Sequence, residues 1–408
     1  MKKKAVITGI GVISPLGKSK EEFWGKLFKG ESAFHDIALF DTEGLKVKKA
    51  GEISDFEPKV ILGEKGLMDV DRASLILMSA AKLALDDAGL EITQENTHST
   101  GVSIGTTFGS LYSMSRFDRE SLTEGPRYVN PSIFPSMVGS SPASRLGIRY
   151  NIKGFNTTVS TGMCAGLDAL DYSRDFIELD RADTIISGGL GDLNIQTFLG
   201  FYKLGYLAGL KNGSVEEMCP FDKRRSGIIL SEGAVIFIVQ DKYLAKKQDR
   251  KTYGEILGTG SCFDPGKFYK YSPRGEGMKR AMELALEDAG IKICDIDCIF
   301  ANANSTKDAD LIESKAIKEV FGENVPVTAV KSIVGETFSA SGTMSVLAAL
   351  GAFEKQSIPA IANYREKDED CDLDYVVGES RKKSISKVMI NSFDPNGASS
   401  CMIVGKPV

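Results

Sequence analysis

The chain has 408 residues, which is enough for two or three packing units or for one large duplicated domain. It is 42% hydrophobic and 26% charged, and its net charge of −5 argues against nucleic-acid binding, which normally needs a basic surplus. No apolar run approaches the roughly 20 residues of a membrane helix, and seven cysteines without framework spacing favour a reducing cytosol.

The basic start of the chain leads directly into Ala5-Val6-Ile7, an apolar run too short for a signal-peptide core. From there, β-branched runs alternate with longer helical patterns, which predicts an α/β fold with helices covering a largely parallel sheet. In chain order we expect a strand at 4–9, helices at 20–29 and 71–88, a strand at 101–105, a helix at 165–178, strands at 184–188, 233–240 and 253–261, a helix at 277–289, a strand at 298–301, a helix at 308–321, a strand at 326–330, a helix at 341–355, and strands at 387–392 and 400–405.

The chain also repeats itself. Residues 81–92, Ala-Lys-Leu-Ala-Leu-Asp-Asp-Ala-Gly-Leu-Glu-Ile, are echoed at 282–293, and a short strand follows each copy. Further along, a strand and a sharp turn open a helix of small residues at 157–170 and again at 327–348. Three matched features in the same order favour duplication over chance, with a boundary near 246–252. We therefore expect two halves, residues 1–250 and 251–408.

One turn is suited to nucleophilic chemistry. Residues 160–170 read Ser-Thr-Gly-Met-Cys-Ala-Gly-Leu-Asp-Ala-Leu, a tight turn followed by a helix. The first N–H groups of a helix and its positive dipole end can lower the pKa of a cysteine, which makes Cys164 a candidate nucleophile. Free cysteines are also among the most buried residues, and from this stretch alone packing is favoured over catalysis.

The whole chain resembles a β-ketoacyl-acyl-carrier-protein synthase of the thiolase superfamily. The motifs that carry the resemblance lie at residues 5–17, 220–223, 231–234, 331–335, 371–374 and 402–405. The resemblance implies a duplicated five-layered αβαβα fold, in accord with the internal repeat, and cap insertions in the N-terminal half.

The catalytic positions of the family are altered in this chain. The cysteine of the family turn is replaced by Met163, the first histidine by Asn304 and the second by Glu336. A thioether cannot form a transferable thioester, and losing one acid–base group commonly costs about 10²–10⁴-fold in rate. The two histidines, His35 and His98, both lie in the first quarter of the chain. We therefore expect no acyl condensation by this chain alone.

A ketosynthase-like chain with these replacements resembles the chain-length factor, the ketosynthase β subunit of type II polyketide synthases. Met163 cannot act as the glutamine that many of them have there, so no decarboxylase role is carried over. The resemblance implies a heterodimer with a ketosynthase α subunit, whose growing poly-β-ketone extends into a tunnel partly formed by this chain. The spacing of Phe108, Leu111, Tyr112 and Ser115 predicts one helix face. That face is either tunnel wall or dimer core, and Phe134 is a further candidate that could reach across the dimer.

The remaining expectations concern ligands and rival functions. Lys331, Glu313 and Phe393 match the family and are interpreted as structural remnants of the former site. Cys294 and Cys298 lack further ligands nearby, so no metal is expected. No cofactor is expected either, since the partner would handle the phosphopantetheine-bound chains of an acyl carrier protein.

We favour an octaketide-like aromatic product over an aryl polyene. Two rivals stay open: an active enzyme that uses Cys164, and a homodimeric ligand-binding protein.

Overall fold

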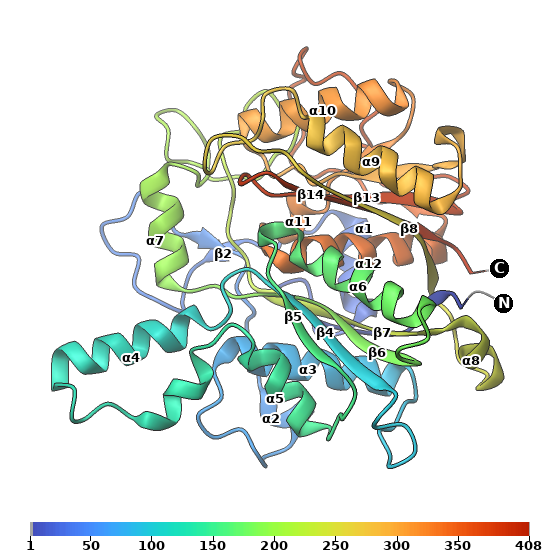
Figure 1. Ribbon diagram of the computed structural model, residues 1–408. Helices are drawn as coiled ribbons and strands as arrows, with labels where there is room; N and C mark the ends of the chain where they lie inside the picture. Colours follow the sequence, from blue (N-terminus) through green and yellow to red (C-terminus); the bar gives the residue numbers. More distant parts are fainter. Residues whose placement is uncertain (1–2, 408) are drawn as a thin grey trace.

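The structure, a computed structural model, describes residues 3–407 of the chain. Two helices, α6 (Ala165–Glu178) and α12 (Ser339–Lys355), lie in its middle, with strands on both sides of them (Figure 1). Helix α12 is apolar or small all round, and all but its last two residues are buried. A helix without a polar face is stable only inside a core, which is why this segment forms the central layer.

The sheet has ten strands in the order β10-β9-β13-β14-β8-β1-β7-β6-β4-β5. Its five central pairs, from β13–β14 to β7–β6, are antiparallel, and the two pairs at each end are parallel, so the expectation of a largely parallel sheet is wrong. The strands are β1 Ala5–Ile13, β4 Thr100–Thr106, β5 Asn156–Val159, β6 Thr184–Gly191, β7 Gly233–Asp241, β8 Gly254–Phe263, β9 Cys298–Phe300, β10 Val327–Thr328, β13 Lys387–Phe393 and β14 Ala398–Gly405. Two short ladders, β2 (His35–Asp36) with β3 (Lys49–Ala50) and β11 (Ser357–Ile358) with β12 (Arg381–Lys382), lie outside it.

Helices cover both outer faces, which gives the five-layered α/β arrangement expected from the resemblance (Figure 1). Helix α3 packs on β1 and β7, while its sequence echo α9 packs on β8 and β14. The remaining helices are α1 Lys20–Lys29, α2 Pro58–Leu62, α3 Arg72–Asp87, α4 Leu111–Glu124, α5 Ser141–Arg149, α7 Ile195–Leu204, α8 Lys242–Lys247, α9 Glu276–Ala289, α10 Lys307–Phe321 and α11 Lys331–Val334, with 3₁₀ turns η1 Pro131–Ser136, η2 Gly162–Cys164 and η3 Ile293–Asp295. Within residues 3–407, none of the helices is long and apolar enough to cross a bilayer.

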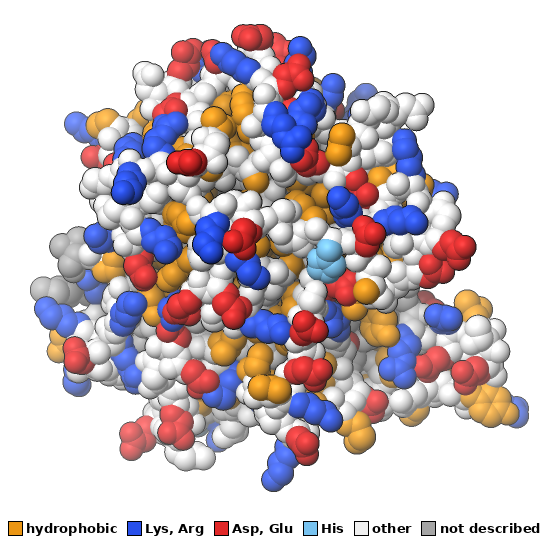
Figure 2. Space-filling model, turned by 180° about the vertical axis from the view of Figure 1, so that it is seen from behind, with side chains coloured by type: hydrophobic (Ala, Val, Ile, Leu, Met, Phe, Trp, Pro, Cys, Tyr) orange, Lys and Arg blue, Asp and Glu red, His pale blue; other side chains and the backbone are white. Residues whose placement is uncertain are grey.

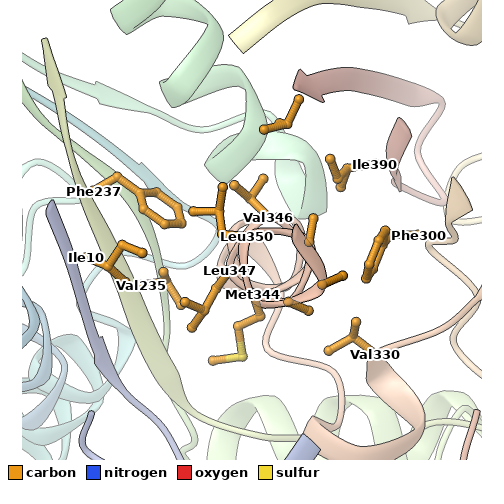
Figure 3. Packing of buried hydrophobic residues seen from close by; sticks show 14 of the residues in the cluster. Ile10, Val235, Phe237, Phe300, Val330, Met344, Val346, Leu347, Leu350 and Ile390 are labelled. Atoms are coloured by element: carbon orange, nitrogen blue, oxygen red, sulfur yellow. The ribbon is translucent and has the colours of Figure 1, made fainter. Parts of the chain in front are cut away.

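The core joins the two halves of the sheet. Around α12, Ile10 and Phe237 from β1 and β7 lie on one side, and Phe300 and Ile390 from β9 and β13 lie on the other (Figure 3). Hydrophobic burial of this extent is the main favourable term in folding. The α6 turn is thereby held between both halves, where a site assembled from both can form.

Every strand and helix predicted from the sequence is present, most within one or two residues at either end. The largest differences are β1, which continues to Ile13, β6, which continues to Gly191, and β10, which contains only Val327 and Thr328. The strand predicted at the start of 157–170 is the edge strand β5, whereas helices α2, α5, α7 and α8 were not predicted. The division into residues 1–250 and 251–408 stays a prediction.

Candidate functional site

The turn before α6 holds Met163 inside the protein. Gly162 has φ +62°, and a Cβ there would lie 2.1 Å from Asp394 Oδ2, so this place in the turn requires glycine. The Met163 side chain is buried in an apolar cluster that includes Leu193, Phe198, Phe201 and Phe338. Its thioether has no proton to lose and lies among aromatic side chains, at the position where the resemblance implies an acyl-accepting thiol.

The backbone N–H of Met163 donates a hydrogen bond to the carboxylate of Asp394. Met163 N donates to Asp394 Oδ2 at 2.9 Å, and Asn396 N donates to Asp394 Oδ1 at 2.8 Å. A free N–H at the start of a helix can stabilise a developing oxyanion. Here that N–H is already bound to a fixed negative group. Sequence analysis did not predict that Asp394 folds back onto this turn.

Cys164 lies one residue further on and has a different environment. It is fully buried, and its Sγ donates to the carbonyl oxygens of Ser392 at 3.1 Å and Ala398 at 3.4 Å. Burial raises the pKa of the Cys164 thiol well above its usual value, and the carboxylates of Asp168 and Asp394 raise it further. The reactive form of cysteine is the thiolate, so this environment opposes nucleophilic attack.

Glu336 forms a buried ion pair. Lys331 Nζ donates to Glu336 Oε2 at 2.8 Å and to Asn302 Oδ1 at 2.9 Å. The other carboxylate oxygen, Glu336 Oε1, accepts from Phe338 N at 3.0 Å and from Ser341 Oγ at 2.8 Å. Both charged side chains are almost completely enclosed. The negative charge that sequence reasoning placed here is therefore neutralised by Lys331, and both of its oxygens accept hydrogen bonds.

Asn304, at the other former histidine position, serves the local backbone. Its Oδ1 accepts from Thr306 N at 3.1 Å and from Thr306 Oγ1 at 2.7 Å, and its own N donates to Asp310 Oδ1 at 2.9 Å. These bonds close a turn of the kind that asparagine side chains commonly make. Of the two histidines, His98 is exposed and His35 lies half-buried on β2.

Glu313 holds the segment before Asn304 in place. Its carboxylate accepts from Asn302 N at 2.8 Å, Ala303 N at 2.7 Å and Asn391 Nδ2 at 3.0 Å. Burial raises the pKa of Glu313 from 4.5 to about 7 despite these bonds. This network agrees with the interpretation of Glu313 as a structural remnant. Phe393 is likewise fully buried, in the apolar cluster of α9, β9 and β13.

The raised pKa of Glu313 predicts a pH dependence of stability. Since the folded protein holds this proton more tightly than the unfolded chain does, the contribution of Glu313 to stability falls as pH rises from about 4.5 to about 7. Glu313→Gln should flatten the fall in melting temperature across that window, whatever its effect on the baseline. Equal slopes in thermal melts of both proteins between these pH values would contradict the assignment.

The predicted tunnel residues divide into two groups. Phe108 precedes α4, because Gly109 has φ +62° and the helix begins only at Leu111; the prediction that Phe108 lies on the helix is therefore wrong. Its ring instead packs edge-to-face on Phe338, with 5.0 Å between centroids. Phe338 is held at φ +53°, a conformation that is strained for a bulky side chain.

The other tunnel residues lie on α4 and η1. Leu111 and Ser115 are half-buried on α4, and Phe134 is exposed on η1. Tyr112 is 52% exposed and lines a cavity of about 510 Å³ between α3, α4, η1 and the end of β6, which we call the α4 cavity. Among the described residues, Tyr112 is the only predicted tunnel residue on its wall. The cavity also contains Ser110 and Asp192, which sequence reasoning missed.

Comparison with known proteins places this site in a family. Residues 2–245 match the sequence profile described as "Beta-ketoacyl synthase, N-terminal domain", and residues 253–365 match "Beta-ketoacyl synthase, C-terminal domain". The chain is 32% identical to 3-oxoacyl-[acyl-carrier-protein] synthase 2 of Coxiella burnetii over 99% of both chains. It is 30% identical to the Synechocystis protein of the same name, over 97% of this chain and 96% of that one.

Solved structures agree with this placement. The ishigamide ketosynthase/chain length factor superposes with a TM-score of 0.93 at 31% identity, covering 100% of both chains. A type II polyketide ketosynthase bound to a hexaketide, in complex with its acyl-carrier protein, superposes with a TM-score of 0.91 at 27% identity, again over 100% of both chains. In sequence over its full length and in fold, the chain belongs to the β-ketoacyl synthase family.

Proposed function

We propose that this chain is the non-catalytic, chain-length-determining subunit of a heterodimeric ketosynthase that builds a poly-β-ketone. The observation that carries the proposal is the state of the α6 turn. Met163 replaces the acyl-accepting thiol, and Asp394 occupies the N–H beside it. Relatives named as 3-oxoacyl-[acyl-carrier-protein] synthase 2 are 32% and 30% identical to this chain. The proposal therefore rests on the side chains of the α6 turn.

A partner is supported by the edge of the sheet. Strand β5 pairs with β4 along one edge, and within residues 3–407 no strand covers its other edge. The Thr158 hydroxyl on β5 is enclosed without a hydrogen-bond partner. A free strand edge is a ready template for pairing with another chain. The catalytic ketosynthase subunit is the proposed occupant, and the acyl carrier protein would dock on the complex.

The segment from residue 108 to 140, which we call the α4 hairpin, is a second surface suited to a partner. It projects from the body of the molecule, at the lower left of Figure 1 and the lower right of Figure 2, where hydrophobic side chains are exposed among charged ones. Leu122 and Tyr128 on the hairpin are 86% and 73% exposed. Exposed apolar surface of this kind marks protein–protein contacts. The hairpin also carries Tyr112, so the contact surface and the proposed tunnel wall are continuous.

The test is product length in the reconstituted heterodimer. Phe108→Ala or Tyr112→Ala should lengthen or scramble the product while leaving acylation of the partner's cysteine intact. Tyr112→Ala removes side-chain volume from the wall of the α4 cavity, and Phe108→Ala removes the ring that packs on Phe338. Tyr243→Ala is the matched control, since Tyr243 is an exposed aromatic residue on the distant helix α8. We expect an octaketide-like aromatic product, with an aryl polyene as the alternative outcome. Unchanged product length in both wall variants would remove these residues from the tunnel.

A further inference from the structure

The α4 cavity contains a hydrogen-bonding group that the protein leaves unused. The Ser110 side chain is 2% exposed and lines the cavity, yet its Oγ has no hydrogen-bond partner. Buried hydroxyls are nearly always paired, with protein or with an ordered molecule. Asp192 lies on the same wall, half-buried at the end of β6, and accepts from Asn194 Nδ2 at 2.7 Å. The wall therefore offers polar atoms to a ligand.

The charges around the α4 cavity disfavour the binding of an anionic ligand. Its two arginines are already paired: Arg72 Nε lies 2.9 Å from Glu232 Oε2, and Arg116 Nε lies 2.9 Å from Glu120 Oε1. Asp192 has no such cation partner among the ion pairs of residues 3–407. The wall also carries the carboxylates of Asp69 and Asp71, so a carboxylate ligand would meet like charge in a partly desolvated space, which is unfavourable. A neutral ligand would not meet this repulsion.

A further part of the cavity wall is apolar and suits an extended acyl chain. Phe40, Phe56, Ile133 and Leu193 contribute aromatic and aliphatic surface to the wall. The volume of about 510 Å³ lies within the range of roughly 300–1,000 Å³ typical of small-ligand pockets. Tyr112 both lines the cavity and is half exposed on the α4 hairpin, so the cavity reaches the surface proposed to face the partner.

Building on the proposed function, we infer that the α4 cavity receives the far end of the growing chain past Tyr112, and that Ser110 and Asp192 bind its carbonyl oxygens. The Ser110 hydroxyl donates to one carbonyl. Burial raises the pKa of Asp192 to about 7, and the charges of Asp71 and Glu232 act in the same direction, so its acid form can donate to another. A hydrocarbon polyene would leave the Ser110 hydroxyl unpaired and could not accept a hydrogen bond from Asp192. The cavity thus distinguishes a keto-bearing chain from a reduced one.

The experiment uses the heterodimer and three variants of this chain. Ser110→Ala and Asp192→Leu should each raise the fraction of products shortened by one or more two-carbon units by about 2- to 10-fold, the equivalent of one lost hydrogen bond. Asp192→Asn keeps a donor and should stay close to wild type. Ser79→Ala is the matched control, because the Ser79 hydroxyl is also buried and unpartnered but does not line the cavity.

A binding measurement accompanies the analysis of product length. A neutral medium-chain β-diketone should raise the melting temperature of the wild-type heterodimer, and the alkane carboxylate of equal length should not. The shift should shrink in Ser110→Ala and Asp192→Leu. If Tyr112→Ala alters product length while the two cavity variants match Ser79→Ala and the diketone gives no shift, the inference fails and the proposed function stands. If product length is unchanged in Tyr112→Ala and in both cavity variants, the proposed function itself fails.

Discussion

Purified alone and incubated with acyl-carrier-protein thioesters, the chain is expected to acquire no acyl group. Met163 has no thiol, and the buried Cys164 thiol has a pKa well above its usual value, so almost no thiolate is present near neutral pH. Intact-mass spectrometry of the chain, with the catalytic partner acylated in a parallel reaction as the positive control, measures this directly. A stable adduct that disappears in Cys164→Ala would overturn the non-catalytic assignment.

Restoring the thiol should not restore condensation. In Met163→Cys the new side chain still sits beside Asp394, which binds the N–H of residue 163. Asn304 and Glu336 supply no imidazole, and each missing acid–base group commonly costs about 10²–10⁴-fold. Turnover by this variant is therefore expected to stay at least about 10²-fold below that of the partner. Acylation of the new cysteine without condensation is compatible with this prediction, whereas condensation at the partner's rate is not.

Local features of the site could be predicted from the sequence because local pattern determines them. Helix α6 begins and ends at the predicted residues, since its apolar stripe and the preceding glycine turn are both visible in the sequence. Sequence analysis favoured packing over catalysis for Cys164, and the structure shows its Sγ against β13 and β14. The methionine at position 163 is read directly from the sequence.

Features that depend on distant segments could not be predicted. The antiparallel pairing of β1 with β7 joins residues more than 200 positions apart, and strand direction leaves no local trace. The contact of Asp394 with Met163 and the α4 cavity likewise arise only when both halves fold together. One signal was available and missed: Gly109, in a left-handed conformation, interrupts the helical spacing between Phe108 and Leu111. Phe108 consequently packs on Phe338 from a loop.

Lys331→Met is expected to lower the free energy of unfolding by about 3–5 kcal/mol, because it leaves Glu336 as a buried, unpaired charge. Chemical denaturation monitored by fluorescence measures the loss. Lys367→Met is the matched control: its pair with Asp372 is half exposed on both sides, and such solvent-screened pairs contribute little to stability. The double variant Lys331→Met/Glu336→Gln should recover part of the loss, because the amide is neutral and keeps an acceptor for Phe338 N and Ser341 Oγ.

Lys331→Met also connects the stability of the protein to the proposed tunnel. Glu336 Oε1 binds the N–H of Phe338, the residue held at φ +53° whose ring packs on Phe108. A strained conformation persists only while its surroundings enforce it. Loosening the ion pair should therefore release Phe338 and broaden the range of product lengths, even under conditions where Lys331→Met remains folded. If Lys331→Met and Lys367→Met lost equal stability and gave identical products, the ion pair would have no role beyond that of a surface contact.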